Sequence, residues 1–339
     1  MERSRVCYGN GGSLSTGAEI ARGNIKRANT KIWTVKRSLK WATRYLKKKG
    51  IENPCLTSEL LLGHLLQKKH FDLYLDGDRD LPYSVRTLFL NLIKKRGQYI
   101  PLSYLTGTQD FMGYSFKVNP RVYIPRPETE ILVEKVLEVA SSTRGRKFIA
   151  IDLGTGCGNI AITLAKQLQR SRIWAVDISP ESLEVARCNA QLHYVDKKVE
   201  FLRGDLFTPL IRLGLERRVD LVISNPPYVA STQMKNLPPE VRKEPKVALE
   251  GGEEGLSVHR RIIWQAPRFL NRGGLLALEI GSGQVKIIKD LISAQPQLLP
   301  PKIVSDYQGK ERVVLTRKRS DWWSGFNEKP RELPKALIS

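Results

Sequence analysis

Short apolar runs that are typical of buried strands occur through the middle of the chain. The clearest of them lie at residues 148–153, 173–177, 199–204 and 219–224. The run at 160–168 has the length and spacing of a helix. Two further strands are predicted at 302–307 and 312–316, on either side of Gly309. The mixture of strands and helices predicts an α/β fold.

Ahead of these strands, apolar residues recur at helical spacing from about residue 33 to residue 100. The groups that predict helices are Leu39, Ala42 and Leu46, then Leu60, Leu61 and Leu65, and then Leu88 and Leu92. Residues 114–118 alternate, Asn119 and Pro120 suit a turn, and residues 122–124 return as a second strand. Because 339 residues exceed the usual span of one core, we expect two domains. These are a helical domain at 31–110 and a larger one at 127–318, joined by a β-hairpin linker at 111–126.

The chain is strongly basic, with 56 Lys and Arg against 34 Asp and Glu and a net charge of +22. Residues 1–50 hold thirteen basic and two acidic side chains, so half of the excess lies in this segment. Residues 1–30, rich in Gly, Ser and Asn, are predicted to be a disordered basic extension, and residues 319–339 a basic tail. Such an arm suits salt-dependent contact with nucleic-acid phosphates, although lysine runs are also typical of a solvated helix face.

The sequence shows no pattern typical of a metal site or of secretion. The four histidines are scattered without metal-ligand or catalytic-triad spacing, and the four cysteines form no C-x-x-C pair. Neither a secretory apolar core nor a membrane span is present. We therefore expect a cytoplasmic protein that works without a metal, although an acid-poor start also imitates an organelle transit peptide.

A glycine-rich turn lies between the strand at 148–153 and the helix at 160–168. Its residues are Gly154, Thr155, Gly156, Cys157 and Gly158. Glycines let backbone approach a ligand closely and allow N–H groups at a helix start to be presented to it. The dinucleotide fingerprint has its third glycine one place later, where Asn159 stands, so a nicotinamide cofactor is disfavoured. Asp177 ends the next strand about twenty residues on, where a ribose diol would be held, and Asp205 is placed to reach the adenine end of the same ligand.

The tetrapeptide Asn225-Pro226-Pro227-Tyr228 directly follows the strand at 219–224. Neither proline has an N–H to donate, so the hydrogen-bond ladder of the strand must end there. The residue before each proline is pushed toward extended geometry, which leaves the Asn225 side-chain oxygen and the Pro226 carbonyl able to accept both hydrogens of one –NH2 group. Tyr228 adds an aromatic face for a flat amide or base. A turn that merely closes a strand would have the same residues, and the neighbouring motifs favour the amino-group pocket.

The order of the motifs D-L-G-T-G-C-G, A-V-D, G-D and S-N-P-P-Y resembles the class I S-adenosylmethionine-dependent methyltransferases. Within that class the chain resembles the glutamine-N5 methyltransferases that modify the Gly-Gly-Gln loop of peptide-chain release factors. Further stretches that carry this resemblance are residues 123–130, 244–245, 248–252 and 278–281, and Gln284. The resemblance covers about residues 35–317. It implies a Rossmann-like methyltransferase domain with a seven-stranded mixed sheet, preceded by a helical substrate-recognition domain.

The same resemblance implies roles for individual residues. Asn225, Pro226 and Tyr228 would be catalytic, and together with Pro227 they would bind the substrate glutamine. The positions that would contact S-adenosylmethionine are Gly154, Thr155, Gly156, Cys157, Gly158, Asp177, Asp205, Leu206 and Asn225. Cys157 and Leu206 depart from the residues that family members often carry there, which are Ser or Thr and, in some, Trp.

The stretch at 126–130 has two interpretations. Pro127 suits the first position of a helix, and Glu128 and Glu130 suit its first turn, where acids meet the helix dipole favourably. The resemblance instead places this segment, with Arg126, over the donor pocket. Residues 244–245 and the turn at 251–255 would form an ordinary surface loop by their sequence alone, and the resemblance implies a loop that orders on substrate binding.

A glutamine amide is a poor nucleophile and the sulfonium methyl a strong electrophile, so we expect catalysis by orientation rather than by a strongly perturbed general base. Two other substrates stay open: a ribosomal-protein glutamine, and a flipped adenine whose amine would meet the same acceptors. A catalytically inactive donor-binding protein is disfavoured because competent residue types fill every position. Release factors are the expected partner, and the basic N-terminus suits contact with the ribosome or with nucleic acid.

Overall fold

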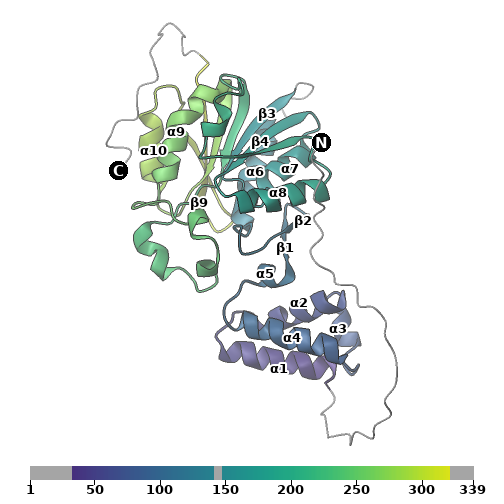
Figure 1. The fold of residues 1–339 in the computed structure, drawn as a ribbon. Coiled ribbons are helices and arrows are strands. Elements are labelled where there is room, and N and C mark those ends of the chain that lie inside the picture. Colours follow the sequence, from purple (N-terminus) through teal and green to yellow (C-terminus); the bar gives the residue numbers. More distant parts are fainter. Residues whose placement is uncertain (1–32, 141–146, 321–339) are drawn as a thin grey trace, which may run out of the picture. The chain divides into compact units, whose positions relative to one another are not determined.

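The computed structural model describes residues 33–140 and 147–320 (Figure 1). Contacts within the chain separate two compact units, and the division lies between Gln98 and Tyr99. The domain boundary expected after residue 110 is later in the chain than this division. The predicted extension at 1–30 and residues 321–339 of the predicted tail lie outside the described residues. None of the described helices is long and apolar enough to cross a membrane.

The first unit is built from helices, as the apolar spacing predicts. α1 begins after Thr34, whose side chain accepts a hydrogen bond from the backbone N–H of Arg37 at 3.3 Å and so caps the helix. Pro54 stands at the first position of α2, where a residue without an N–H breaks no helical hydrogen bond. The helices are α1 (Val35–Lys48), α2 (Pro54–Leu66), α3 (Asp72–Leu75) and α4 (Tyr83–Arg96).

The buried faces of α2 and α4 differ by one residue from those predicted. Leu61 and Leu62 of α2 are fully buried, whereas Leu60 is 37% exposed. In α4, Phe89 is buried and Leu88 is 54% exposed. Both helices carry runs of adjacent apolar residues, so helical spacing fits two neighbouring faces, and packing against α1 decides between them.

The β-hairpin pairs differently from the prediction. β1 (Thr108–Phe111) pairs with β2 (Tyr114–Lys117), and Met112 and Gly113 form the turn with φ of 51° and 75°. Positive φ at both central residues is typical of the turns that join antiparallel strands. Residues 119–124, predicted to turn and return, contain no strand. Alternation located β2 correctly, but it could not show that the partner strand precedes it.

The second unit contains a seven-stranded mixed sheet, which confirms the predicted fold class. The strand order is β5-β4-β3-β6-β7-β9-β8, and β9 runs antiparallel to both of its neighbours while the other pairs are parallel. The strands are β3 (Phe148–Leu153), β4 (Ser171–Asp177), β5 (Val199–Arg203), β6 (Val219–Ser224), β7 (Leu270–Glu279), β8 (Lys302–Ser305) and β9 (Glu311–Arg317).

Helices cover both faces of this sheet (Figure 1). Apolar side chains alternate along the strands, so that Ala150 joins the core under α6, α7 and α8, and Ile151 joins the core under α9 and α10. In β4, Ala175 and Trp174 divide between the two cores in the same way. The helices of this unit are α5 (Leu102–Thr106), α6 (Pro127–Ala140), α7 (Asn159–Gln167), α8 (Pro180–Leu192), α9 (Ser257–Phe269) and α10 (Val285–Ser293).

The chain leaves the two central strands, β3 and β6, in opposite directions. β3 leads through α7 to β4, whereas β6 leads through α9 to β7 on the other side. Such a reversal leaves a crevice at the carboxyl ends of the two strands, where ligands bind in open α/β sheets. Ser224 at the end of β6 donates to the carbonyl of Leu153 at the end of β3, at 2.7 Å. This hydrogen bond holds the two strand ends together.

Gly158 caps the start of α7, at a point where an added methyl group has no room. Its φ is 85°, and a Cβ would lie 2.9 Å from Ile162 Cδ1 and 3.2 Å from Ala186 Cβ. Gly214 is a matched control, because its φ of 62° is also positive but a Cβ there would meet nothing within 4 Å. We expect Gly158→Ala to lower the free energy of unfolding by about 1–3 kcal/mol more than Gly214→Ala, through overpacking, in urea denaturation. Equal losses in the two variants would contradict this clash.

Candidate active site

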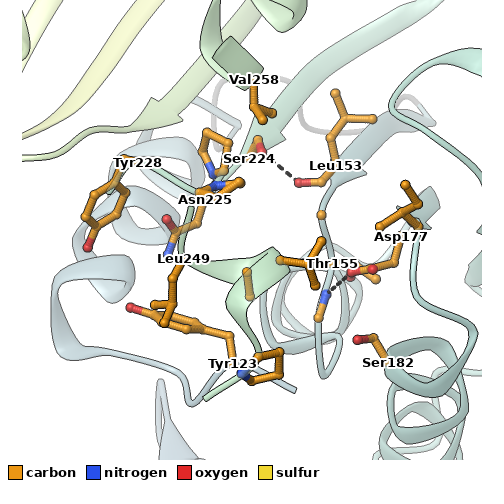
Figure 2. Close-up of a pocket in the computed structure, with 18 of the residues that line it drawn as sticks. Tyr123, Leu153, Thr155, Asp177, Ser182, Ser224, Asn225, Tyr228, Leu249 and Val258 are labelled. Atoms are coloured by element: carbon orange, nitrogen blue, oxygen red, sulfur yellow. Dashed lines mark hydrogen bonds between the residues drawn. The ribbon is translucent and has the colours of Figure 1, made fainter. Parts of the chain in front are cut away.

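A cavity of about 1130 Å³ opens at the carboxyl ends of β3, β4 and β6. Figure 2 shows Thr155 and Asp177 on one side of it and Asn225 and Tyr228 on the other. The turn after β5 and all four residues of the Asn-Pro-Pro-Tyr motif also line it. Gly158 does not line the cavity, because it packs against Ala186 of α8. Apart from Gly158, the predicted positions border a single cavity although they are far apart in sequence.

The glycine turn contributes space to the cavity, and most of its N–H groups bond within the protein. The N–H groups of Gly154 and Thr155 both donate to the Val176 carbonyl, at 2.8 and 3.0 Å, and that of Gly156 donates to Asp177. The N–H group of Gly158 donates to the Thr155 carbonyl at 2.8 Å, so the three glycines use their own N–H groups within the protein. The prediction that N–H groups at the start of α7 are presented to a ligand stays a prediction. Gly156 has a φ of 57°, and a Cβ there would meet nothing within 4 Å, so the absent side chain leaves open volume.

Backbone donors fix the carboxylate of Asp177 in the cavity wall. Its Oδ2 accepts from the N–H of Gly156 at 2.8 Å, and its Oδ1 accepts from the N–H of Ser179 at 2.9 Å. Burial raises the pKa of Asp177, and these hydrogen bonds lower it in part. Each carboxylate oxygen can accept a second hydrogen bond. Asp177 can therefore hold the two hydroxyls of a diol, which is the role that the sequence predicts.

Asp152 supports the turn from within the core, where it is fully buried. Its Oδ2 accepts from the Thr155 hydroxyl at 2.7 Å, and its Oδ1 has no hydrogen-bond partner in the described part of the chain. Burial raises the pKa of Asp152 to about 7. The sequence alone indicates no role for this residue. Its signal is an acid inside an otherwise apolar strand, immediately before the glycine turn.

The cavity is also lined by Asp205, Leu206 and Cys157, which differ in their contacts and exposure. Asp205 forms an ion pair with Arg261 of α9, and its side chain is 48% exposed. Leu206 follows in the left-handed region, with a φ of 47°. The Cys157 thiol is buried, and burial raises its pKa to about 12. Because the thiolate is the reactive form, Cys157 supplies a small apolar wall and not a nucleophile.

Asn225 stands directly after β6, and one neighbour holds its amide. Its Nδ2 donates to the hydroxyl of Thr129 in α6 at 3.0 Å. Within residues 33–140 and 147–320, no side chain or backbone N–H donates to Asn225 Oδ1 or to the Pro226 carbonyl. Both residues line the cavity. The two acceptors that the sequence predicts for one –NH2 group are thus unused by these parts of the protein.

Contacts with later segments clamp the Asn-Pro-Pro-Tyr motif. The backbone N–H of Val229 donates to the Leu249 carbonyl at 2.9 Å. Gln284 donates from Nε2 to the Tyr228 carbonyl at 3.0 Å, while its Oε1 accepts from the N–H of Gly281 at 2.8 Å. These hydrogen bonds fix the backbone immediately after the two candidate acceptors.

Arg126 joins the segment before α6 to the loop before residue 249. Its guanidinium pairs with the buried carboxylate of Glu244 and lies over the ring of Tyr123, 5.0 Å from the ring centroid. The other Glu244 oxygen accepts from the N–H of Ile124 at 3.0 Å. Burial raises the pKa of Tyr123 and raises that of Tyr228 to about 12, so both phenols are neutral near pH 7. These contacts close one wall of the cavity.

The residues at 126–130 divide between structural and cavity positions. Pro127 is the first residue of α6, and Glu128 and Glu130 lie in its first turn. Glu130 accepts from the N–H of Met112 at 2.6 Å and so holds the hairpin turn. Arg126 and Glu128 instead border the cavity.

Thr129 and Glu279 are site residues that the sequence analysis did not single out. Both are buried, and the Thr129 hydroxyl donates to Glu279 Oε2 at 2.6 Å. Glu279 ends β7, which pairs with β6 in the sheet, and it therefore lies next to the strand end that carries Asn225. Burial raises the pKa of Glu279 to about 7. The available signal is that both residues stand within the stretches that carry the family resemblance.

Two histidines, His193 and His259, make contacts with backbone carbonyls that are structural in kind. His259 is buried with Nε2 2.9 Å from the Glu279 carbonyl, and His193 Nε2 lies 2.9 Å from the Ser115 carbonyl. Across the described residues, no group of three His, Cys, Asp or Glu side chains is arranged to hold a metal ion.

Two family models match this chain: the PrmC N-terminal domain at residues 38–107 and the methyltransferase small domain at residues 127–253. A release factor glutamine methyltransferase of Moorella thermoacetica is 39% identical over 288 residues, which make up 85% of this chain and 100% of that protein. One of Geobacter sulfurreducens is 39% identical over 263 residues, 77% of this chain and 89% of that protein. The chain belongs to the release factor glutamine methyltransferase family.

Membership of this family confirms the resemblance inferred from the motifs. The first match spans most of α1 and the helices up to α5, and the second spans β3 to β6 with the Asn-Pro-Pro-Tyr motif. The family is therefore a methyltransferase family, and the cavity lies within its methyltransferase domain.

Gln284 should matter for turnover because it fixes the backbone after the candidate acceptors. Gln295 is a matched control: its Nε2 donates to the Trp264 carbonyl at 3.2 Å and its Oε1 accepts from the N–H of Gln297 at 3.4 Å, away from the cavity. We expect Gln284→Met and Gln295→Met each to destabilise the fold by about 1–3 kcal/mol, and only the first to lower kcat, by about tenfold or more. Urea denaturation and methyl-transfer kinetics measure the two effects. A similar kcat in both variants would contradict a role for the clamp.

Proposed function

We propose that this protein transfers the methyl group of S-adenosylmethionine to the side-chain amide nitrogen of a glutamine in a peptide-chain release factor. The observation that carries the proposal is the pair of unused acceptors, Asn225 Oδ1 and the Pro226 carbonyl, at a cavity that Asp177 also lines. The names of family relatives supply the substrate class. The substrate residue would be the glutamine of the Gly-Gly-Gln loop.

The residues at the ends of β3, β4 and β5 fit the methyl donor. Gly154 and Gly156 leave open volume, so a ligand can lie close to the backbone. Asp177 can accept hydrogen bonds from both ribose hydroxyls, and Asp205 and Leu206 border the same cavity for the adenine end. When bound, the sulfonium group supplies an electrophilic methyl. Cys157 adds an apolar wall, and the proposed reaction needs no metal.

The protein would contribute orientation to the reaction. Asn225 Oδ1 and the Pro226 carbonyl can each accept one hydrogen of the substrate –NH2, which directs its nitrogen toward the methyl group. Orientation of this kind contributes roughly 7–11 kcal/mol in favourable cases. Positive charge grows on the nitrogen as it is methylated, and the two oxygen dipoles stabilise that charge more than they stabilise the neutral amide. Tyr228 supplies a neutral aromatic face for the flat amide.

The protein is further proposed to dock its substrate through one unit and to contact a second partner through its N-terminus. The first unit, much of which the PrmC N-terminal domain model matches, is the proposed docking region for the release factor. Residues 1–30 are proposed to contact the ribosome or nucleic acid, and the protein is proposed to act in the cytoplasm. A ribosomal-protein glutamine and an adenine amine would meet the same two acceptors, and the family relatives favour the release factor.

Replacing Asn225 separates an enzyme from a donor-binding protein. We expect Asn225→Ala to lower kcat by about 100-fold or more, because one of two acceptors aimed at the developing charge is removed, with donor affinity changed far less. The assay measures labelled methyl transfer from S-adenosylmethionine to a purified release factor. Controls are the factor with its loop glutamine changed, and bare DNA and RNA. Label on nucleic acid alone would overturn the proposed substrate.

Asp177 should control donor binding and not the amide. We expect Asp177→Ala to weaken binding of S-adenosylmethionine by about tenfold or more, because two charge-assisted hydrogen bonds to a diol are lost. Asp290→Ala, on the exposed side of α10, is the control for loss of an acid. Equilibrium dialysis with the labelled donor measures both. Unchanged affinity in the Asp177 variant would show that the diol lies elsewhere.

A further inference from the structure

The proposed reaction requires one particular end of the Asn225 amide to face the substrate. Only the oxygen can accept a hydrogen from the substrate –NH2, whereas the amide nitrogen of Asn225 is a donor. Rotation of this side-chain amide by half a turn exchanges the two ends at little change in shape. The protein must therefore contain a contact that distinguishes them.

That contact is the hydroxyl of Thr129, which lies 3.0 Å from Asn225 Nδ2 and 2.6 Å from Glu279 Oε2. The hydroxyl has a single hydrogen, and an ionised carboxylate can only accept, so Thr129 must donate to Glu279. Its lone pairs then face Asn225 and require a donor there. The –NH2 end of Asn225 satisfies this requirement, and an oxygen in its place would face the hydroxyl oxygen with no hydrogen between them.

We propose that Thr129 and Glu279 are positioning residues that orient the Asn225 amide so that its oxygen faces the substrate. This inference rests on the proposed methyl transfer to an amide. Glu279 is 1% exposed and does not line the cavity, so it acts through Thr129 and not on the reacting atoms. Thr129 lies in α6, Glu279 ends β7 and Asn225 directly follows β6. The order of hydrogen bonds runs from Asn225 to Thr129 to Glu279.

The surroundings of Glu279 leave its charge without a dedicated partner among the described residues. The titratable groups that interact electrostatically with its carboxyl are Glu128, Arg126, Tyr123, Tyr228 and Arg312, and His259 contacts its backbone carbonyl. Both arginines are engaged elsewhere, Arg126 with Glu244 and Arg312 with Asp306 at 3.0 Å. Burial lowers the pKa of His259 to about 4, so this ring is neutral.

Protonation of Glu279 should weaken the orientation. Burial raises the pKa of this carboxyl to about 7, so the carboxylate is present above pH 7 and is lost as the pH falls below it. The neutral acid can donate to Thr129, whose own hydrogen is then free to bond Asn225 Oδ1 and turn the amide the wrong way. We expect kcat at saturating donor to fall several-fold as the pH falls through about 7.

Four variants test the proposal with the full-length protein, labelled S-adenosylmethionine and a release factor. Thr129→Val keeps the side-chain shape without the hydroxyl, and Thr129→Ser keeps the hydroxyl. Thr163→Val is the matched control, because Thr163 is fully buried and its hydroxyl has no hydrogen-bond partner among the described residues. Glu279→Gln replaces the titrating carboxyl with an amide, whose oxygen can still accept a hydrogen bond from Thr129.

We expect Thr129→Val to lower kcat by about 10- to 100-fold at unchanged KM for the donor, since misplaced acceptors cost orientation. Thr129→Ser should recover most of this loss, and Thr163→Val should show none. Glu279→Gln should lower kcat several-fold and flatten the pH profile between pH 6 and 8. Burial raises the pKa of Asp152 to about 7 as well. A fall in kcat that Asp152 causes would remain in the Glu279 variant, so the variant separates the effects of the two acids.

Two outcomes would overturn the proposal: full kcat in Thr129→Val, or full kcat together with an unchanged acidic limb in Glu279→Gln. If Thr129→Val does not fold, as judged by urea denaturation beside Thr163→Val, the kcat and pH profile of Glu279→Gln still decide. An inactive wild-type protein would count against the proposed methyl transfer itself. An active wild type with an unaffected Thr129→Val would reject only the positioning role.

Discussion

The hydrogen bond between Ser224 and Leu153 joins the carboxyl ends of the two strands on which the candidate site depends. β3 and β6 are neighbours in the sheet, but the chain leaves them in opposite directions, and this reversal leaves a crevice at their ends. The donor-facing turn follows one strand and the Asn-Pro-Pro-Tyr motif follows the other. A small shift between these strands would separate the two halves of the site, because each half is fixed to its own strand end.

The hydrogen-bonding groups that stay unpaired in the cavity wall determine which ligands it can bind. The turn after β3 directs the N–H groups of Gly154 and Thr155 to Val176 and that of Gly156 to Asp177, so these three donors are not available to a ligand. Oxygen acceptors remain on Asp177, Asn225 and Pro226 instead, all of which line the cavity. A cavity lined in this way selects ligands that donate hydrogen bonds, as ribose hydroxyls and an amide –NH2 do.

Local sequence was enough to locate the central strands, α6, the glycine turn and the Asn-Pro-Pro-Tyr motif, because glycine and proline act on their own backbone. It was not enough where packing between distant segments decides. The apolar faces of α2 and α4 and the partner of β2 depend on neighbours that spacing does not reveal. The N–H groups of Gly154, Thr155 and Gly156 bond to β4, about twenty residues further along the chain. The same limit hid Asp152 and Glu279, whose roles depend on the hydroxyls of Thr155 and Thr129.

Glu279 shows why a short motif cannot carry this chemistry alone. A buried carboxyl without an ion-pair partner is unfavourable, and an apolar residue at the end of β7 would be easier to accommodate. Yet with an apolar residue there, the hydroxyl of Thr129 could either accept from the Asn225 nitrogen or donate to the Asn225 oxygen. The amide of Asn225 could then adopt both orientations. The acid removes that ambiguity because an ionised carboxylate can only accept a hydrogen bond. Thr129 must then donate to Glu279 and accept from Asn225. The unfavourable burial of one charge thus defines which atom of Asn225 meets the substrate.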